Sequence, residues 1–194
     1  MPAELDFFYS PDRENWRQWL ADNHDSAAGI LFVFYKKKSG KPTLTYGEAV
    51  EEALCFGWVD SLPKKMDDER HALKFSPRKP RSVWSKPNKE RVERLVDNGR
   101  MTPVGQAKID RAKSDGSWDA LNDSDNLVIA DDLAIALIEN PVAGANFHNF
   151  SPGSRKIILS WIGSAKRPET RANRIAETVR LAELGKRANF PADR

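Results

Sequence analysis

The hydrophobic residues divide the sequence into a front part with strand patterns and a longer back part with helix patterns. The densest apolar run is AGILFVFYKKK, residues 28–38, in which β-branched and aromatic residues follow one another without alternation. Such a run is typical of a β-strand, and the missing alternation predicts that both of its faces are covered. The shorter runs WVDSL and ALKFS, residues 58–62 and 72–76, are separated by a polar stretch and predict a β-hairpin.

Two segments with helix start signals flank the first strand. Ser10 and Pro11 predict the N-cap and the first position of a helix that ends near His24. The segment TYGEAVEEALCFG, residues 45–57, starts with a threonine that is followed three residues later by Glu48. This spacing is the capping box, in which each residue's side chain accepts a hydrogen bond from the other's backbone amide.

From Ser85 onward the strand patterns disappear and helical patterns take over. The expected helices lie in residues 88–100, 102–116, 131–140, 151–167 and 168–185. The polar segment 116–130 predicts a linker between helical groups. We therefore expect an α+β fold, with a small N-terminal sheet and flanking helices followed by a helical C-terminal half. The corresponding domains are residues 1–84 and residues 85–194.

Composition narrows the class of protein. A chain of 194 residues with 40% hydrophobic residues can bury a core in one domain or two small ones. The net charge of +3 is too small to indicate a nucleic-acid binder, so the distribution of charge matters more. A single cysteine fits a reducing compartment. The N-terminus has no signal-peptide pattern, and no apolar run approaches the roughly 18 residues of a membrane span. We expect a cytoplasmic protein.

The cysteine and the histidines give little support to catalysis or to metal binding. Cys55 lies in the last turn of an expected helix, where the helix dipole disfavours a thiolate, so a buried structural thiol is expected. His24, His71 and His148 are far apart and lack the spacing of a metal-binding pair. No Gly-rich nucleotide loop or nucleophile elbow is present. The sequence therefore predicts no cofactor.

An acidic ridge on the second helix leaves two interpretations open. Glu48 and Glu52 are four residues apart and share a helix face with Glu51 beside them. Carboxylates grouped in this way can attract a hard cation weakly. A solvated helix face is the simpler interpretation.

The segment KFSPRKPRSVWSKPN, residues 74–88, contains five basic residues and no carboxylate. Arg78 and Arg81 provide planar guanidinium groups suited to phosphate or carboxylate, and Trp84 provides a stacking face. Three prolines stiffen the backbone and lower the entropy lost on binding. The alternative is a basic connector whose tryptophan docks into the core. An inward Trp84 with outward arginines would favour a site, whereas arginines paired to carboxylates would favour a hinge.

Further residues complete the predicted site. Lys86 and Asn88 close the basic segment, and Asp60 in WVDS is expected to orient one of its arginines. In AKRPETRANR, Arg171 and Arg174 are three residues apart and lie on one helical stripe, which we expect to form a second wall.

Four motifs together resemble the YdeI/OmpD-associated family, also described as bacteriocin-protection proteins. The motifs are ALCFGWVDS, FSPRKPRSVWSKPN, GRMTPVGQAKIDRAK and AKRPETRANRI, and the resemblance extends from about Phe8 to Ala188. It implies tolerance to bacteriocins or antimicrobial peptides and association with an outer-membrane porin, but it brings no reaction and no catalytic residue. The N-terminal half is also similar to small α/β domains of the YdhG type, which have been likened to frataxin-like iron chaperones.

These observations lead to one functional hypothesis with two alternatives. The hypothesis is a cytoplasmic, non-catalytic stress or defence protein that binds an anionic partner, either a nucleic acid or a phosphorylated metabolite, through the basic segment. Replacing both Arg78 and Arg81 with alanine should then abolish the interaction without unfolding the protein. One alternative is an enzyme acting on an anionic metabolite, with Asp60 as acid or base. The other is a weak iron-binding chaperone that uses the acidic helix.

Overall fold

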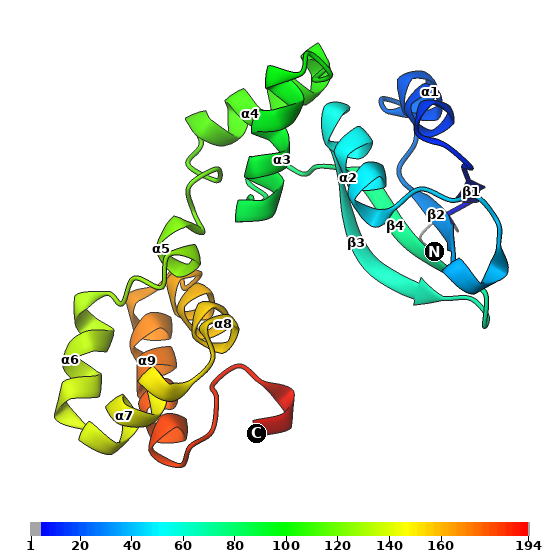
Figure 1. Ribbon diagram of the computed structural model, residues 1–194. Helices are drawn as coiled ribbons and strands as arrows, with labels where there is room; N and C mark the ends of the chain where they lie inside the picture. Colours follow the sequence, from blue (N-terminus) through cyan, green and yellow to red (C-terminus); the bar gives the residue numbers. More distant parts are fainter. Residues whose placement is uncertain (1–4, 194) are drawn as a thin grey trace. The chain divides into compact units, whose positions relative to one another are not determined.

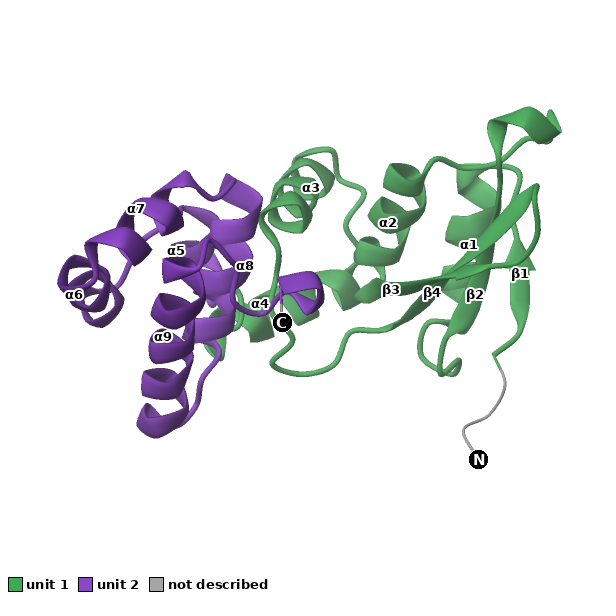
Figure 2. Cartoon of the chain, turned by 90° about the horizontal axis from the view of Figure 1, so that it is seen from below, with its two compact units in different colours: residues 1–118 green, residues 119–194 purple. Residues whose placement is uncertain are grey.

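The chain forms two compact units, seen here in a computed structural model that describes residues 5–193. Unit 1 extends to Trp118 and unit 2 begins at Asp119 (Figure 2). Each unit buries its own set of hydrophobic side chains. Among the described residues, every helix is either too short or too polar to cross a lipid bilayer.

The described part of unit 1 is built on a four-stranded sheet with the strand order β1-β2-β4-β3. The strands are β1 (Phe7–Tyr9), β2 (Ile30–Tyr35), β3 (Trp58–Lys65) and β4 (Arg70–Pro77). β1 pairs with β2 in parallel, whereas β4 pairs with β2 and with β3 in antiparallel fashion. The strand predicted within residues 28–38 is β2, and the predicted hairpin is formed by β3 and β4, so both predictions are confirmed. β1 was not predicted, because three residues are too few to show a pattern.

The two faces of the sheet differ in how completely they are covered. On one face, Phe32 and Phe34 of β2 are buried in the core. On the other face, Leu31 and Tyr35 of the same strand are only half-buried. The prediction that both faces of this strand are covered is therefore correct for the first face and only partly correct for the second.

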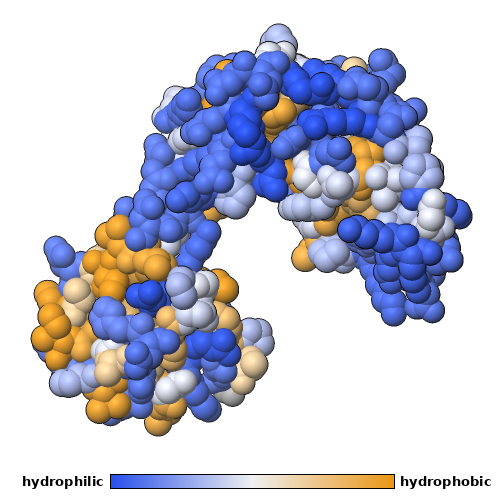
Figure 3. All heavy atoms as spheres, viewed as in Figure 1, coloured by the Kyte–Doolittle hydropathy of each residue, from blue (hydrophilic) through white to orange (hydrophobic). Residues whose placement is uncertain are grey.

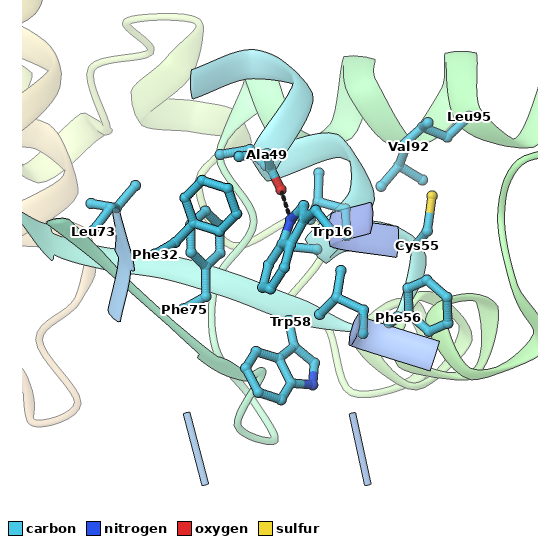
Figure 4. Close-up of a cluster of buried hydrophobic side chains, with 14 of the residues drawn as sticks. Trp16, Phe32, Ala49, Cys55, Phe56, Trp58, Leu73, Phe75, Val92 and Leu95 are labelled. Atoms are coloured by element: carbon cyan, nitrogen blue, oxygen red, sulfur yellow. Dashed lines mark hydrogen bonds between the residues drawn. The ribbon is translucent and has the colours of Figure 1, made fainter. Parts of the chain in front are cut away.

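Helices α1 (Arg13–Asn23) and α2 (Tyr46–Cys55) lie on the same side of the sheet (Figure 1). Trp16 of α1 is fully buried, and its indole nitrogen donates a 3.0 Å hydrogen bond to the carbonyl oxygen of Ala49 in α2 (Figure 4). A buried indole N–H normally needs such a partner. This bond fixes the two helices against each other above the sheet.

The helix start signals are confirmed for α2 and corrected for α1. Thr45 and Glu48 form the predicted capping box of α2. The N-cap of α1 is Asp12, whose side chain accepts from the amide of Asn15, and not Ser10. The hydroxyl of Ser10 instead donates to the carbonyl oxygen of Asp12. Asp12, two residues after Ser10, is the N-cap of α1 instead of Ser10. Aspartate and serine are both good N-cap residues.

Helices α3 (Lys86–Asp97) and α4 (Pro103–Ser114) belong to unit 1. Their buried residues include Leu95 and Ile109, which join the same core as the sheet. At the start of α4, a β-carbon on Gly105 would lie 2.3 Å from the carbonyl oxygen of Cys55, so only glycine permits this approach. The units therefore divide after Trp118, later than the sequence-predicted boundary at residue 84, because the first two back-half helices complete the sheet's core.

Unit 2 is helical, as predicted for the C-terminal half. Its helices are α5 (Asn122–Asp125), α6 (Asp131–Glu139), α7 (Pro141–Asn149), α8 (Pro152–Gly163) and α9 (Pro168–Glu183), and a 3-10 turn covers Pro191–Asp193. Phe147, Ile158 and Leu181 are buried in its core. α5 lies in the segment expected to be a linker. α7 was not predicted, since its sequence PVAGANFHN has a weak helical pattern.

Hydrophobic residues also reach the surface of unit 2 (Figure 3). On α6, Ile135 and Ile138 are 56% and 76% exposed, and Val142 at the start of α7 is 56% exposed. Apolar surface of this kind is typical of a contact face. It contrasts with the strongly hydrophilic surface that dominates unit 1 in the same view.

Candidate anion-binding pocket

The loop between β4 and α3, residues 78–85, is held in a defined conformation, and we call it the basic loop. The amide of Arg78 donates a 2.9 Å hydrogen bond to the carbonyl oxygen of Gly57, which anchors the start of the loop. The carbonyl oxygen of Lys79 accepts from both the amide and the hydroxyl of Ser82. Between them Arg81 adopts φ 60°, a left-handed conformation that costs a non-glycine residue roughly 1 kcal/mol. Local strain of this kind often accompanies a functional site.

Trp84 connects the basic loop to the core of unit 1. Its side chain is 1% exposed and packs against Trp118, with 5.0 Å between the ring centroids. The guanidinium carbon of Arg78 lies 3.7 Å from the centroid of the Trp84 ring. The tryptophan thus points inward and serves as a platform for the arginine, a favourable cation–π arrangement.

Arg78 is buried without an anionic partner. Only 6% of the residue is exposed, and no described carboxylate lies within ion-pair distance of it. Its terminal nitrogens donate to the hydroxyl of Ser82 and the carbonyl oxygen of Val83 at 3.2–3.4 Å, and its Nε has no hydrogen-bond partner among the described residues. Burial lowers the pKa of Arg78 to about 10, although the charge of Asp60 opposes the shift. The side chain therefore keeps its positive charge at neutral pH.

Helix α4 provides the second wall of a pocket that we call the basic-loop pocket. Lys108, Arg111 and Asp115 are spaced three and four residues apart, so they lie on one helical face toward the loop. The pocket has a cavity volume of about 30 Å³. Its lining comprises Arg78, Lys79, Pro80, Arg81, Ser82, Trp84, Lys108, Arg111, Ala112, Asp115 and Ser117. The basic side chains therefore outnumber the carboxylates around a small cavity.

The carboxylate in this lining belongs to Asp115, which already accepts a hydrogen bond within the protein. Asp115 accepts a 3.0 Å hydrogen bond from the amide of Ser117. Hydrogen bonding from Ser117 lowers the pKa of Asp115, and the charges of Arg111 and Arg81 contribute to the same shift. Asp115 thus compensates part of the positive charge on α4 and forms no ion pair with Arg78.

The structure brings together part of the predicted site. Arg78, Arg81 and Trp84 all line the basic-loop pocket. Lys86 is exposed at the start of α3, outside this lining. The side-chain oxygen of Asn88 accepts a 3.1 Å hydrogen bond from Arg91, so it acts within α3.

Asp60 influences the pocket from a distance. Its carboxylate accepts a 3.0 Å hydrogen bond from the hydroxyl of Tyr46, and it is not part of the pocket lining. It still favours the charged form of Arg78 electrostatically. The predicted orienting contact with an arginine is thus replaced by a longer-range interaction.

The arginines expected to form a second wall lie in unit 2 and have partners there. Arg171 donates two hydrogen bonds to Asp132, at 2.6 and 2.8 Å. Arg174 donates to the carbonyl oxygen of Trp161 and to the hydroxyl of Ser164. Both side chains therefore contribute to packing inside unit 2.

Lys108 and Arg111 were not predicted as site residues. Their spacing on the expected helix 102–116 showed that they share a face, but nothing in the sequence indicated that this face meets the basic loop. The contact depends on how α4 docks through Gly105 and Ile109, which is a tertiary property.

Glu51 and Glu52 of the acidic ridge on α2 form ion pairs with arginines. The fully buried carboxylate of Glu52 accepts from Arg13, Arg17 and Arg100, at 2.5–2.9 Å. Glu51 pairs with Arg13 as well. Among the described residues, no three His, Cys, Asp or Glu side chains are grouped so that they could hold a metal ion. The ridge is a structural ion network, and burial raises the pKa of the Cys55 thiol below it.

The fold and the pocket define an α+β protein of two units, with a basic pocket in the sheet-containing unit. Residues 8–108, just over half of the chain, match the family model described as "Domain of unknown function (DUF8412)". The chain belongs to this family. Residues 126–185, within unit 2, match the model described as "Bacteriocin-protection, YdeI or OmpD-Associated". The chain thus carries a YdeI/OmpD-associated domain, which confirms the predicted family for residues 126–185 and not over the expected range from about Phe8 to Ala188. Searches of curated proteins and of solved structures found no match.

Proposed function

We propose that the basic-loop pocket binds a small oxyanion, such as one phosphate group of a larger ligand, and that the protein acts as a non-catalytic binding module. The observation that carries this proposal is the buried guanidinium of Arg78, which has no ion-pair partner among the described residues and an unused Nε donor. Burying an unpaired charge costs several kcal/mol. An anion in the pocket would offset that cost and accept the unused hydrogen bond.

The dimensions and chemistry of the pocket favour an oxyanion. A cavity of about 30 Å³ exceeds the roughly 10–15 Å³ that one water molecule needs, and it is far smaller than a drug-sized site. It therefore suits a single phosphate or carboxylate group, with the rest of the ligand outside. Guanidinium groups from Arg78, Arg81 and Arg111 match such groups in shape and charge.

The alternatives have less support. An enzyme with Asp60 as acid or base would need this carboxylate in a pocket, whereas Asp60 does not line this one. A metal chaperone would need the carboxylates of Glu51 and Glu52, which are held by arginines. A binding module needs only the positive lining.

The description of the second family suggests a biological setting. A domain of the YdeI/OmpD-associated, bacteriocin-protection type supports a role in stress or defence, and the single cysteine, Cys55, suits the cytoplasm. In this role the pocket would bind a phosphorylated metabolite or a phosphate of a nucleic acid.

The proposal is tested by thermal unfolding in sodium phosphate and in sodium chloride at equal ionic strength. Phosphate should raise the Tm of the wild type, because a ligand that binds only the folded state stabilises it. Replacing Lys108 and Arg111 with glutamine should remove most of this rise. The matched control is Arg180→Gln, an exposed arginine paired with Glu177 in unit 2, which should respond like the wild type. Equal responses of all three proteins would contradict the proposal.

A further inference from the structure

The face of the sheet opposite α1 and α2 displays a row of aromatic side chains. Phe8 contacts Trp16 and Phe32 on the helix side, so its neighbours Phe7 and Tyr9 point to the opposite face. Phe7 is 50% exposed and Tyr9 is 36% exposed. Tyr9 also packs edge-on against the half-buried Tyr35 of β2, with ring centroids 5.1 Å apart. Rings from two neighbouring strands thus form a partly exposed aromatic surface.

Lysine side chains surround these rings. The Nζ of Lys41 lies 4.6 Å from the ring centroid of Tyr35, and the Nζ of Lys64 lies 5.2 Å from that of Phe7. Lys74 of β4 is exposed and lies opposite Leu31 in the strand register, on the same face. None of these three lysines forms an ion pair with a carboxylate in the described part of the chain. The surface therefore combines aromatic rings with unpaired positive charge.

The segment after β2 extends the basic edge of this face. It reads KKKSGK from Lys36 to Lys41 and includes a 3-10 turn over Lys37–Ser39. The hydroxyl of Tyr9 donates to the carbonyl oxygen of Pro42, which holds the segment beside the aromatic row.

Acidic residues flank this face in the described part of the chain. Asp67, Asp68 and Glu69 lie in the turn between β3 and β4, and the exposed Asp6 directly precedes Phe7 of β1. Asp67 is committed to Arg70 and to backbone amides of the turn. Positive charge therefore prevails over the rest of the face.

Charge and shape together point to one occupant. We propose that this sheet face, made of Phe7, Tyr9 and Tyr35 with Lys41, Lys64 and Lys74, binds single-stranded nucleic acid. Exposed aromatic rings provide stacking surfaces for unpaired bases, and the surrounding lysines complement the phosphates. In a duplex the bases are stacked on each other, so their faces cannot reach the rings. An acidic peptide would match the lysines but would gain nothing from the aromatic row.

This site shares no residue with the basic-loop pocket. The pocket is lined by residues 78–84 of the basic loop and by residues 108–117, none of which belongs to the aromatic row or its lysines. Oligonucleotide binding that is lost when Lys108 and Arg111 are replaced with glutamine would belong to the pocket, and binding that persists in this variant would belong to the sheet face, so each proposal can fail without the other.

The test is fluorescence anisotropy of a labelled oligothymidylate of about 12 nucleotides, a length within the roughly 4–16 nucleotides that one OB fold covers. The full-length protein should bind it at low salt and should bind a duplex of equal length more weakly. Replacing Phe7 and Tyr9 with leucine should weaken binding roughly tenfold or more, while Phe7→Trp should preserve it. Circular dichroism verifies that the variants are folded.

Charge variants separate a specific face from general attraction. Replacing Lys41 and Lys64 with glutamine should weaken binding and reduce the slope of log K against log salt by about 0.7 for each lysine. The matched control replaces Lys166 and Lys186, exposed lysines of unit 2, and should bind like the wild type. The proposal is overturned if the wild type does not bind, if the leucine variant binds equally well, or if the control loses as much affinity. Equal competition by an oligoglutamate of the same charge would also overturn it.

Discussion

Two buried charged residues in unit 1 have opposite surroundings. Glu52 is fully buried and accepts hydrogen bonds from three arginines, so its charge is compensated within the protein. Arg78 is 6% exposed and is contacted by the Trp84 ring and by neutral oxygens, while the charge of Asp60 acts on it only from a distance. The pKa of Arg78 is depressed from the ordinary arginine value to about 10, which corresponds to a cost on the order of 3 kcal/mol for keeping its charge in this site. Glu52 thus stabilises the fold, whereas the proposed function assigns Arg78 a role in ligand binding.

The replacement Arg78→Met tests this difference. Methionine is apolar and similar in length, so the variant should be as stable as the wild type, or more stable, in anion-free buffer, because the unpaired charge is gone. The variant should gain no stability from phosphate. Urea unfolding with and without phosphate measures both effects. A variant that is several kcal/mol less stable in anion-free buffer would show that Arg78 is mainly structural.

The Glu52 network predicts a pH dependence of stability. Burial alone would raise the pKa of Glu52, but the hydrogen bonds and charges of Arg13, Arg17 and Arg100 outweigh it, and the pKa falls below its ordinary 4.5. A lowered pKa means that the unfolded state takes up the proton more readily. The stabilisation is therefore present above about pH 4.5 and is lost as the pH falls through the folded-state value.

Glu52→Gln should cost about 3–5 kcal/mol near neutral pH, because three arginines lose a buried partner. The variant's free energy of unfolding should also change less than that of the wild type between about pH 5 and about pH 3. The control Glu14→Gln removes a 76% exposed carboxylate that contacts Arg100, and it should cost less than about 1 kcal/mol. Equal losses in both variants would contradict the network's role.

At the level of elements, the sequence predicts those helices and strands that carry a local signal such as a capping box or a dense apolar run. The capping box at Thr45 and Glu48 and the strand at residues 30–35 are local patterns, and both form. The helix α7 and the short strand β1 lack such patterns and were missed. In the pocket, Arg78, Arg81 and Trp84 were predicted because one loop carries them all. The α4 wall was missed because its position depends on packing between distant segments.

The sheet illustrates the same limit. Its apolar strand β2 predicted two covered faces, yet the face that carries Tyr35 is only partly buried. The row of rings on that face comes from register: Tyr9 lies beside Val33 in the parallel β1–β2 pair, which places Phe7 and Tyr9 on the same side as Tyr35. A single sequence does not specify this register, since β1 is not recognisable by pattern.

At the level of the whole molecule, the division after Trp118 places the basic loop inside a folded unit. The sequence-predicted boundary at residue 84 placed the loop between two domains. In the structure the loop lies inside unit 1, where Trp84 is buried between the sheet's core and Trp118. The pocket is therefore a property of one folded unit.

This division makes a direct prediction about fragments. A fragment of residues 1–118 should unfold cooperatively, because it contains the whole core of unit 1. A fragment of residues 1–84 should be much less stable or unfolded, since it lacks Val92, Leu95 and Ile109 and would expose Trp84. Near-ultraviolet circular dichroism during thermal unfolding distinguishes the two. Equal stability of both fragments would favour the boundary at residue 84.

A crystal structure of the full-length protein grown in selenate would show whether unit 1 contains an oxyanion site. The anomalous signal of selenium distinguishes the bound anion from water and from chloride. We expect a peak in the basic-loop pocket, within hydrogen-bonding distance of Arg78 Nε and beside the side chains of Arg81 and Arg111. Selenate bound elsewhere on the protein while this pocket stays empty would contradict it.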